Sequence, residues 1–482
     1  MKKFVVFLLT AMLIFSFSFS AMAATTGTPI SSLNDLKSLN GAKKGTFYLT
    51  KDITIPKNSD FSPIENFNAT FDGNGKKIIN LNIKVDGENT ETYGGLFATI
   101  GASGNVSDLT LENVTIECTS KKDKSYIKVG AIAGENGGTI NNCRVSGTIS
   151  VNAPLSTVYV GGIVGFNEKR IKHLENFANI EATGAAVYAG GIVGAYTKNA
   201  GKPLEECINH GHLNVSGEKS TSYGGGIVGR SSMEVRNCAN YGDVFVYSDV
   251  DAFAAGIAGT LTDKDYVTKC FSAGKISCNS SARQFWDAVF ATEEAGYENL
   301  AMSCYYLENS VSGKSVGEIK TATALSAEAA KQSDSFSNFV FNDTWKMVDG
   351  KLALKGITAA KPVVTTVENP NNPNGSQGGS QGGSQDGSQG GGTQGTTSGS
   401  AGNTTSGSAG GSADGTVSGD EYIPPIDLNS STIGGSNETE SSPAGIGDFT
   451  PKKALPIWLF AILAVAAAAG VCVFLYTYKK KN

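Results

Sequence analysis

The chain has 482 residues, 60 of them glycine, and a formal net charge of −5 at pH 7. So small a charge over this length excludes nucleic-acid binding, which needs a concentrated basic face to neutralise phosphates. Once the two apolar ends and a low-complexity segment are set aside, residues 24–357 are numerous enough to build a large hydrophobic core.

Residues 1–23 have the layout of a secretory signal peptide. Lys2 and Lys3 give a positive start, an apolar run extends to Phe19, and Ala21-Met22-Ala23 supplies the small residues that signal peptidase accepts. We predict cleavage after Ala23 and export of the chain. An uncleaved N-terminal membrane helix is the alternative, which the shortness of the apolar run disfavours.

Residues 24–92 are predicted to form an N-terminal cap and the first coils of a repetitive fold. A helix-like stretch from Leu33 to Leu39 is placed to cover an open end, where exposed strands would otherwise invite pairing. Asp72-Gly-Asn-Gly75 is a turn signal between two short apolar runs.

Residues 93–310 repeat one motif of glycine and aliphatic residues, which is clearest in Val160-Gly-Gly-Ile-Val-Gly165. Further copies end at Ala98, Gly134, Gly194, Gly229 and Gly259, and a decayed copy ends at Ala291. The intervals between successive ends are 36, 31, 29, 35, 30 and 32 residues. Self-similarity at this period indicates a solenoid, and the absence of long helical periodicity excludes leucine-rich and helical repeats.

A second motif follows the first in each period. It reads Asn237-Cys238-Ala-Asn-Tyr-Gly242 in one copy, with related copies around Cys143, Cys207 and Cys270, and we align Phe177 with the cysteine in the third coil. Two short strand-like runs per period, separated by Gly, Asn and Lys clusters, predict an all-β fold. We expect a right-handed parallel β-helix.

Like residues stack on like in such a β-helix, about 4.8 Å apart along its axis. The glycines of the first motif would let backbones approach where side chains collide, and Asn beside Cys suits turns and stacked amides. We expect the aliphatic residues of the first motif to lie in buried strands, namely Ile163, Ile192, Ile227, Ile257, Val164, Val193 and Val228.

The two motifs resemble the GLUG repeat, named for its Gly-Leu/Ile-Val-Gly core, over roughly Tyr93 to Cys304. The segments 61–64 and 71–78 look like that family's opening coils, and 345–352 looks like its closing strand pair. Residues 311–357, with a helix-like stretch from Leu325 to Gln332, are therefore expected to form a C-terminal cap. The resemblance implies a bacterial surface protein. Some larger relatives are immunoglobulin A proteases, but no His-Glu-x-x-His is present here to carry that activity.

Seven cysteines lie between Cys118 and Cys304. Stacked strands hold Cβ atoms about 4.8 Å apart, whereas a disulfide needs roughly 3.8 Å. Because their count is odd and their spacing follows the coil, most are predicted to be buried free thiols, with a disulfide network as the alternative.

The polar residues do not form a recognisable catalytic or metal-binding pattern. His210 and His212 alternate as two metal ligands would, but the nearby Cys207 is expected to point inward, so no metal or other cofactor is predicted. Polysaccharide cleavage needs paired carboxylates about 5 to 9.5 Å apart. The acids that could supply them lie at different offsets of the repeat, so no catalytic, cofactor or metal residue is assigned; they are Asp243, Asp249, Asp251, Asp263 and Asp265.

Residues 358–453 are rich in Gly, Ser and Gln and predict a disordered stalk. Residues 454–478 carry no charge and are long enough for a transmembrane helix, and the basic tail 479–482 is expected in the cytoplasm. This predicts a single-pass protein of the cell membrane with an extracellular N-terminal part. The end also resembles a cell-wall sorting signal, but Leu455-Pro456-Ile457-Trp458 lacks its Thr-Gly. A retained anchor is favoured, with processing by a sortase-like enzyme and cell-wall association left open.

We therefore predict a non-enzymatic surface protein, adhesin-like or a scaffold, that presents a rigid repeat on a flexible stalk. Its partner would be an extracellular ligand, either a glycan, a matrix protein or a neighbouring cell surface. A polysaccharide-active β-helix lyase or hydrolase and a purely structural envelope component are the alternatives.

Overall fold

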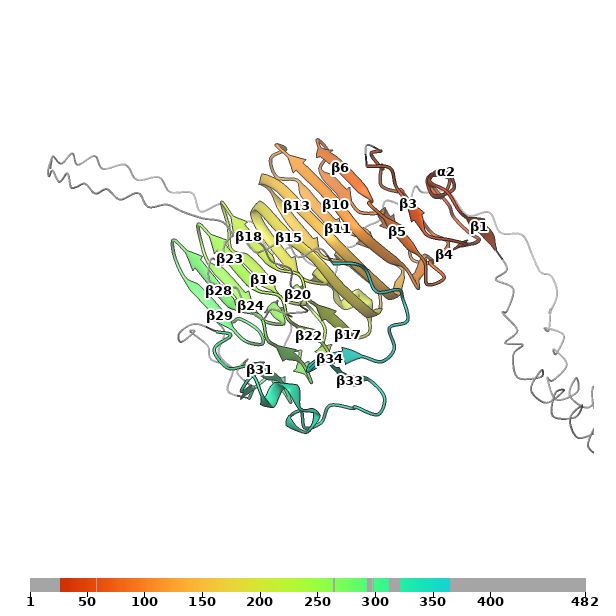
Figure 1. Ribbon diagram of the computed structural model, residues 1–482. Helices are drawn as coiled ribbons and strands as arrows, with labels where there is room; N and C mark the ends of the chain where they lie inside the picture. Colours follow the sequence, from red (N-terminus) through yellow and green to blue (C-terminus); the bar gives the residue numbers. More distant parts are fainter. Residues whose placement is uncertain are drawn as a thin grey trace, which may run out of the picture. The chain divides into compact units, whose positions relative to one another are not determined.

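The computed structural model describes residues 27–364, apart from residues 58, 263–264, 293–296, 298 and 312–320. This part of the chain is nearly all strand and winds into a parallel β-solenoid of about seven turns (Figure 1). The predicted all-β class and parallel solenoid are thus confirmed. The predicted signal peptide, residues 365–453 of the predicted stalk, the membrane helix and the basic tail lie outside the described residues. No helix in the described part is long and apolar enough to cross a membrane.

Strands of successive turns pair in parallel and in register, so each turn adds one rung to several ladders. The first ladder contains β1 (Thr28–Ile30), β2 (Thr46–Leu49), β4 (Thr70–Asp72), β9 (Asn105–Ser107), β21 (Val235–Arg236), β26 (Val267–Thr268) and β30 (Ala301–Met302). The second contains β3 (Ile53–Thr54), β5 (Lys77–Ile79), β22 (Ala239–Asn240), β27 (Phe271–Ser272), β31 (Tyr305–Leu307) and β32 (Thr323–Leu325).

Three further ladders complete each turn. The third contains β6 (Asn82–Gly87), β18 (Leu213–Gly217), β23 (Val244–Ser248) and β28 (Ile276–Ser280). The fourth contains β7 (Glu91–Gly94), β11 (Tyr126–Gly130), β19 (Ser222–Gly225), β24 (Ala252–Ala255) and β29 (Gln284–Asp287). The fifth is a separate six-stranded sheet of β8 (Phe97–Ile100), β12 (Ala133–Asn136), β14 (Val164–Asn167), β16 (Val193–Tyr196), β20 (Val228–Ser231) and β25 (Ala258–Leu261).

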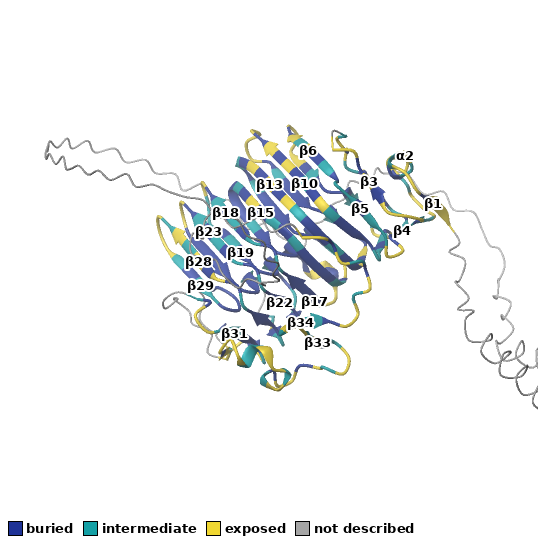
Figure 2. Ribbon diagram, viewed as in Figure 1, coloured by how far each residue is buried: buried dark blue, intermediate teal, exposed yellow. Residues whose placement is uncertain are grey.

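Four strands run through more than one ladder. They are β10 (Thr110–Ser120), β13 (Thr139–Gly161), β15 (Ile171–Gly190) and β17 (Leu204–Asn209). Three of them have 11 to 23 residues, and β17 has six. Buried residues alternate with half-buried and exposed ones along strands such as β10, and exposed residues are also frequent in the turns at the strand ends (Figure 2).

A column of left-handed residues forms the corner between the first and second ladders. Its members have φ between 52° and 57°, a region that Asn and Asp tolerate better than most residues, and they are Asp108, Asn142, His173, Glu206, Asn237, Lys269 and Ser303. The bend turns the next residue inward, so a buried column follows it: Leu109, Cys143, Leu174, Cys207, Cys238, Cys270 and Cys304. Our alignment of Phe177 with the cysteines is therefore wrong, because Leu174 pairs with both Cys143 and Cys207.

A ladder of buried amides forms the corner between the second and third ladders. The Nδ2 of Asn176 donates to Oδ1 of Asn209 at 2.9 Å, and Asn209 donates in turn to Asn240 at 2.8 Å. Each amide also closes hydrogen bonds with the backbone two residues further on, as Asn209 does with Gly211. The expected stacked amides are present, but at this second asparagine rather than beside the cysteine.

The glycines of the first motif make room for this amide ladder. A Cβ on Gly191 would lie 2.1 Å from the carbonyl oxygen of Gly226 and 2.3 Å from Cγ of Asn209. Contacts this short do not occur for real Cβ atoms, so only glycine fits between the neighbouring backbone and the buried amide. The prediction that these glycines permit close backbone approach is confirmed.

The aliphatic residues of the first motif are fully buried, as predicted. Val164, Val193 and Val228 stack in the six-stranded sheet. Each isoleucine that precedes them, such as Ile192, lies in the bend before that sheet rather than in a strand, which corrects our placement of the four isoleucines. The reason is geometric, since the Gly-Ile pair turns the chain from the fourth ladder into the fifth.

The two ends of the described solenoid are finished differently. Helix α2 (Leu33–Lys37) is capped by the side chain of Ser32 and buries Leu36 in the main core, as expected for a cap. At the other end the chain passes through η2 (Ala329–Lys331) and η3 (Ser333–Ser335) to an antiparallel hairpin. That hairpin comprises β33 (Trp345–Val348) and β34 (Lys351–Leu354), and a further short helix, η1 (Lys198–Ala200), lies in a mid-solenoid turn.

The C-terminal segment covers a side of the solenoid. Trp345 and Leu352 are buried against an outward-facing row of the second ladder that includes Ala239, Phe271 and Tyr305. The segment therefore shields apolar rings that the coil sequence places on the outside of the second ladder.

Candidate functional site

Residues 355–364, which we call the strap, run from the hairpin back along the solenoid towards earlier turns (Figure 1). The backbone amides of Thr358 and Ala359 donate to Oδ1 of Asn142 at 2.8 and 3.1 Å. The carbonyl of Ala360 accepts from the hydroxyl of Thr110 at 2.6 Å. Seven of these ten residues belong to the range that composition assigned to the stalk, namely 358–364, yet they lie along the solenoid.

Charged residues hold the strap at both sides of Asn142. Arg144 donates to the carbonyl of Ala359, and a carboxylate oxygen of Glu112 accepts from the amide of Val363 at 2.9 Å. Burial opposes the charge on Glu112, but hydrogen bonds from Lys77 and Val363 prevail and hold its pKa below the usual value. The strap is thus fixed by polar contacts to residues more than 200 positions away in the chain.

Removing one amide should loosen the strap selectively. In Asn142→Gly the left-handed backbone is kept but both acceptor contacts to Thr358 and Ala359 are lost, so we expect those amides to exchange hydrogen at least ten times faster. Hydrogen exchange read by mass spectrometry measures this. Asn237→Gly is the matched control, because Asn237 occupies the same corner in a later turn and makes no described strap contact. Equal protection of the strap in both variants would contradict this anchoring.

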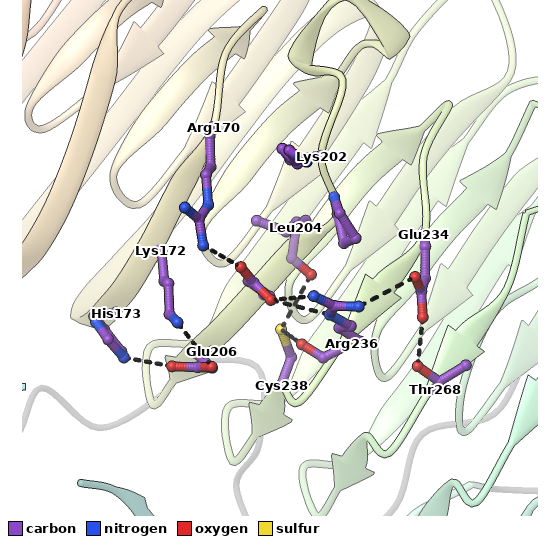
Figure 3. Close-up of polar contacts among 12 residues, drawn as sticks. Arg170, Lys172, His173, Lys202, Leu204, Glu206, Glu234, Arg236, Cys238 and Thr268 are labelled. Carbon is purple, nitrogen blue, oxygen red and sulfur yellow. Dashed lines mark hydrogen bonds and ion pairs between the residues drawn. The ribbon is translucent and has the colours of Figure 1, made fainter. Parts of the chain in front are cut away.

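A ladder of charged side chains lies on the outside of the first ladder (Figure 3). Glu205 lies between Arg170, whose Nη2 is 2.7 Å from one carboxylate oxygen, and Arg236, which contacts the other at 2.7 and 3.0 Å. Glu206 pairs with Lys172 at 3.1 Å and with His173. Glu205 and Glu206 are therefore both matched by basic side chains from neighbouring turns.

These contacts determine the protonation of the ladder. Burial raises the pKa of Glu205 and Glu206, but hydrogen bonds from Arg170 and Arg236, and from His173 and Lys172, outweigh it and lower both pKa values. A carboxyl acting as general acid in glycoside cleavage needs the opposite shift. This ladder is consequently suited to holding charge in place rather than to donating protons.

His210 and His212 lie in the turn between β17 and β18 and line one pocket. His210 Nε2 is 3.1 Å from Glu175, which also accepts from Arg144 at 2.6 Å, and the amide of Asp243 donates to Nδ1 of His212. Cys207 is buried in the core, as predicted. Among the described residues no group of three His, Cys, Asp or Glu side chains is placed to hold a metal ion.

The pocket has a volume of about 180 Å³ and opens beside the end of the strap. Its polar wall consists of Asn113, Ser146, Thr148, Asn179 and the two histidines, with the backbone of Gly147. Its apolar wall is the ring of Phe177 with Val363 and Val364 of the strap. Among the described residues that line it, none is Lys, Arg, Asp or Glu.

Three of the acids considered from the sequence have separate partners. Asp243 accepts from the amide of Lys275, Asp249 from the hydroxyl of Tyr247, and Asp251 from Arg283. Asp263 lies outside the described residues. The described contacts thus place these side chains in turns, as their offsets in the repeat predict.

The described cysteines are free thiols, and six of the seven are buried, as predicted. Cys207, Cys238, Cys270 and Cys304 occupy one position in four successive turns of the core. The Sγ atoms donate to nearby backbone carbonyls, as Cys143 does to Asn141 at 3.3 Å. Burial raises the pKa of Cys143 to about 12 and that of Cys207 well above its usual value.

Because these four thiols are fully buried in the core, out of reach of a reagent, we expect them to resist alkylation in the folded protein. Brief treatment with N-ethylmaleimide followed by peptide mass spectrometry should leave Cys207, Cys238, Cys270 and Cys304 unlabelled. The same treatment in denaturant should label all four. Cys278, which is half-buried, is the internal comparison and should be labelled first. Peptides linked through Cys207 and Cys238 in a non-reducing digest would overturn the free-thiol interpretation.

Comparisons with known proteins show only limited similarity to this chain. The chain is 32% identical to halomucin of Haloquadratum walsbyi over 161 residues, which is 29% of this chain and 2% of halomucin. A Bacteroides ovatus crystal structure described as a candidate immunoglobulin A1 protease aligns with a TM-score of 0.39 and 17% identity, over 68% of this chain and 91% of the other. No family model matches the chain. The resemblance to the GLUG repeat therefore stays a prediction.

Several residues of the pocket and the strap were not predicted from the sequence. Phe177 was read as a core residue, and Asn113, Asn179 and Val363 were not singled out. Phe177 did carry a signal, because it follows an asparagine of the second motif just as His210 and Tyr241 do. The strap carried none, since its contacts join residues far apart in the chain.

Proposed function

We propose that this chain is a non-enzymatic, adhesin-like or scaffolding protein of the cell surface. The observation that carries the proposal is the state of the outward carboxylates in the charged ladder. Glu205 and Glu206 are paired with basic side chains from adjacent turns, and the pKa values of both carboxyl groups are lowered. Such a surface favours binding, because proton transfer would need a carboxyl that is protonated near neutral pH.

The sequence supports the placement at the surface. A signal peptide at 1–23, a Gly/Ser-rich stalk and a membrane helix at 454–478 would hold a right-handed, GLUG-like solenoid outside the cell. Repeated turns could then offer similar weak contacts side by side, and tethering would raise their effective concentration. The partner would be a glycan, a matrix protein or a neighbouring cell.

The proposal is tested on an array of glycans and matrix proteins probed with the purified full chain. We expect retention on a subset of spots with no new reducing or unsaturated sugar ends. Release of shortened products from any polysaccharide would favour the lyase or hydrolase alternative. Retention on no spot would contradict an adhesin and favour a structural role in the envelope.

The topology has its own test on intact cells or protoplasts. Added protease should release the solenoid by cutting within residues 365–453, because a cytoplasmic basic tail places everything before the membrane helix outside. Immunoblotting of the supernatant measures the release, with a cytoplasmic protein as the control for lysis. A solenoid that survives until the cells are lysed would show that the orientation is wrong.

A further inference from the structure

An aromatic stack on the outside of the solenoid ends at Phe177. The rings of Phe177 and His210 stack at 4.4 Å with an interplanar angle of 4°, and Tyr241 stacks on His210 at 5.3 Å and 8°. In the preceding turn the residue in register with Phe177 is Ser146, whose small side chain accepts a hydrogen bond from Asn113. No described aromatic ring covers the second face of Phe177, which therefore faces the pocket.

Polar groups surround this open ring face. The hydroxyl of Thr148 makes no hydrogen bond to a described residue. Asn179 is in register with Thr148 on the next turn; its Oδ1 accepts from the amide of His212 at 2.9 Å, and its Nδ2 has no described partner. His210 is already held by Glu175, which keeps the stack in place. The pocket thus offers an apolar platform with hydroxyl and amide groups at its edge.

The size and charge of the pocket restrict its occupant. Its 180 Å³ equals the liquid volume of about six water molecules, which is close to the space of a single pyranose ring. A charged ligand would find no oppositely charged Lys, Arg, Asp or Glu among the described lining residues, and a purely apolar one would leave the amides and hydroxyls unpaired. A ligand with C–H groups on one face and hydroxyls around its edge meets both requirements.

We infer that the pocket beside the strap binds one neutral sugar unit of a glycan, with the sugar's C–H face on Phe177 and its hydroxyls towards Thr148 and Asn179. This inference rests on the proposed function, because it names the ligand class for the binding surface. Val363 and Val364 line the pocket, so the docked strap is part of the site.

The test titrates the purified full chain with neutral oligosaccharides and, separately, with oligouronates, by calorimetry. We expect saturable binding of a neutral sugar, at least tenfold weaker in Phe177→Ala and measurably weaker in Thr148→Val. Phe245→Ala is the matched control, because Phe245 is a half-buried aromatic residue on β23 outside the pocket. Circular dichroism melting shows whether each variant keeps its fold.

The outcomes separate this inference from the proposed function. Binding of oligouronates alone, no neutral sugar bound, or equal affinity in Phe177→Ala and the parent would overturn the pocket assignment. If the parent and the Phe177→Ala variant were then retained equally on array spots, the proposed function would stand without the pocket. Sugar binding lost in Phe177→Ala, with no retention on any array surface, would support the pocket and contradict the adhesin.

Discussion

Val193→Asp is expected to lower the free energy of unfolding of the solenoid by about 3 to 5 kcal/mol. Val193 is fully buried and stacks between Val164 and Val228 in the six-stranded sheet, where a carboxylate would have neither water nor a cation. Stability in a solenoid is a sum of contacts between neighbouring turns, so the damage should reach the turns on either side first. Thermal and denaturant unfolding of the full chain measures the loss.

Val348→Asp is the control for the charge itself. Val348 is 43% exposed at the tip of the hairpin, so the same substitution should change stability by no more than about 0.5 kcal/mol. Equal unfolding of Val193→Asp and the parent would mean that the repeated motif does not form the core, and the solenoid assignment would fall with it.

Asn209→Ala is expected to cost about 2 to 5 kcal/mol, although it removes only one small polar group. The amide of Asn209 joins Asn176 to Asn240 and closes two hydrogen bonds with the backbone of Gly211, all in the buried corner. Removing it leaves several buried donors and acceptors without partners at once. Denaturant unfolding should show a lower midpoint with an unchanged slope, because the surface exposed on unfolding stays the same.

Asn199→Ala is the control for Asn209→Ala, because it removes an exposed side-chain amide that does not belong to the ladder of buried amides. Asn199 is exposed in η1, and its side chain makes one described contact, to Glu168 at 3.3 Å. We expect its removal to be close to neutral. A cost for Asn209→Ala no larger than that for Asn199→Ala would show that the buried amides add nothing to the core.

The repeat was readable from the sequence because its physics is local. The Gly-Gly-Ile-Val-Gly motif recurs at one period, and each of its positions meets the same surroundings in every turn, so the parallel stacking of Val164, Val193 and Val228 followed from the pattern. The alignment failed where two residues competed for one role. Leu174 and Phe177 are both apolar and three positions apart, and only the left-handed corner at His173 decides that Leu174 points inward.

The docking of the strap and the pocket beside it could not be predicted from the sequence. Residues 355–364 read Lys-Gly-Ile-Thr-Ala-Ala-Lys-Pro-Val-Val and contain neither repeated motif, so no pattern in them indicated that they dock. Their binding depends on Asn142, Arg144 and Glu112, which the repeat places outside the core for reasons of turn geometry. A pocket formed between segments so far apart in the chain produces no repeating pattern in the sequence.

Because the strap runs back along the solenoid, it determines where a pulling force applied to its C-terminal end first acts on the fold. The strap ends beside Glu112, in an early turn, rather than beyond the last strands, so Val364 and the N-terminal strand β1 both lie towards the same end of the solenoid. Tension applied at residue 364 is borne first by the bond between Val363 and Glu112, then by those at Ala360, Ala359 and Thr358. These strap contacts would therefore break one at a time before the force reaches any turn of the solenoid. The strap would in this way protect the stacked turns from the first part of the load.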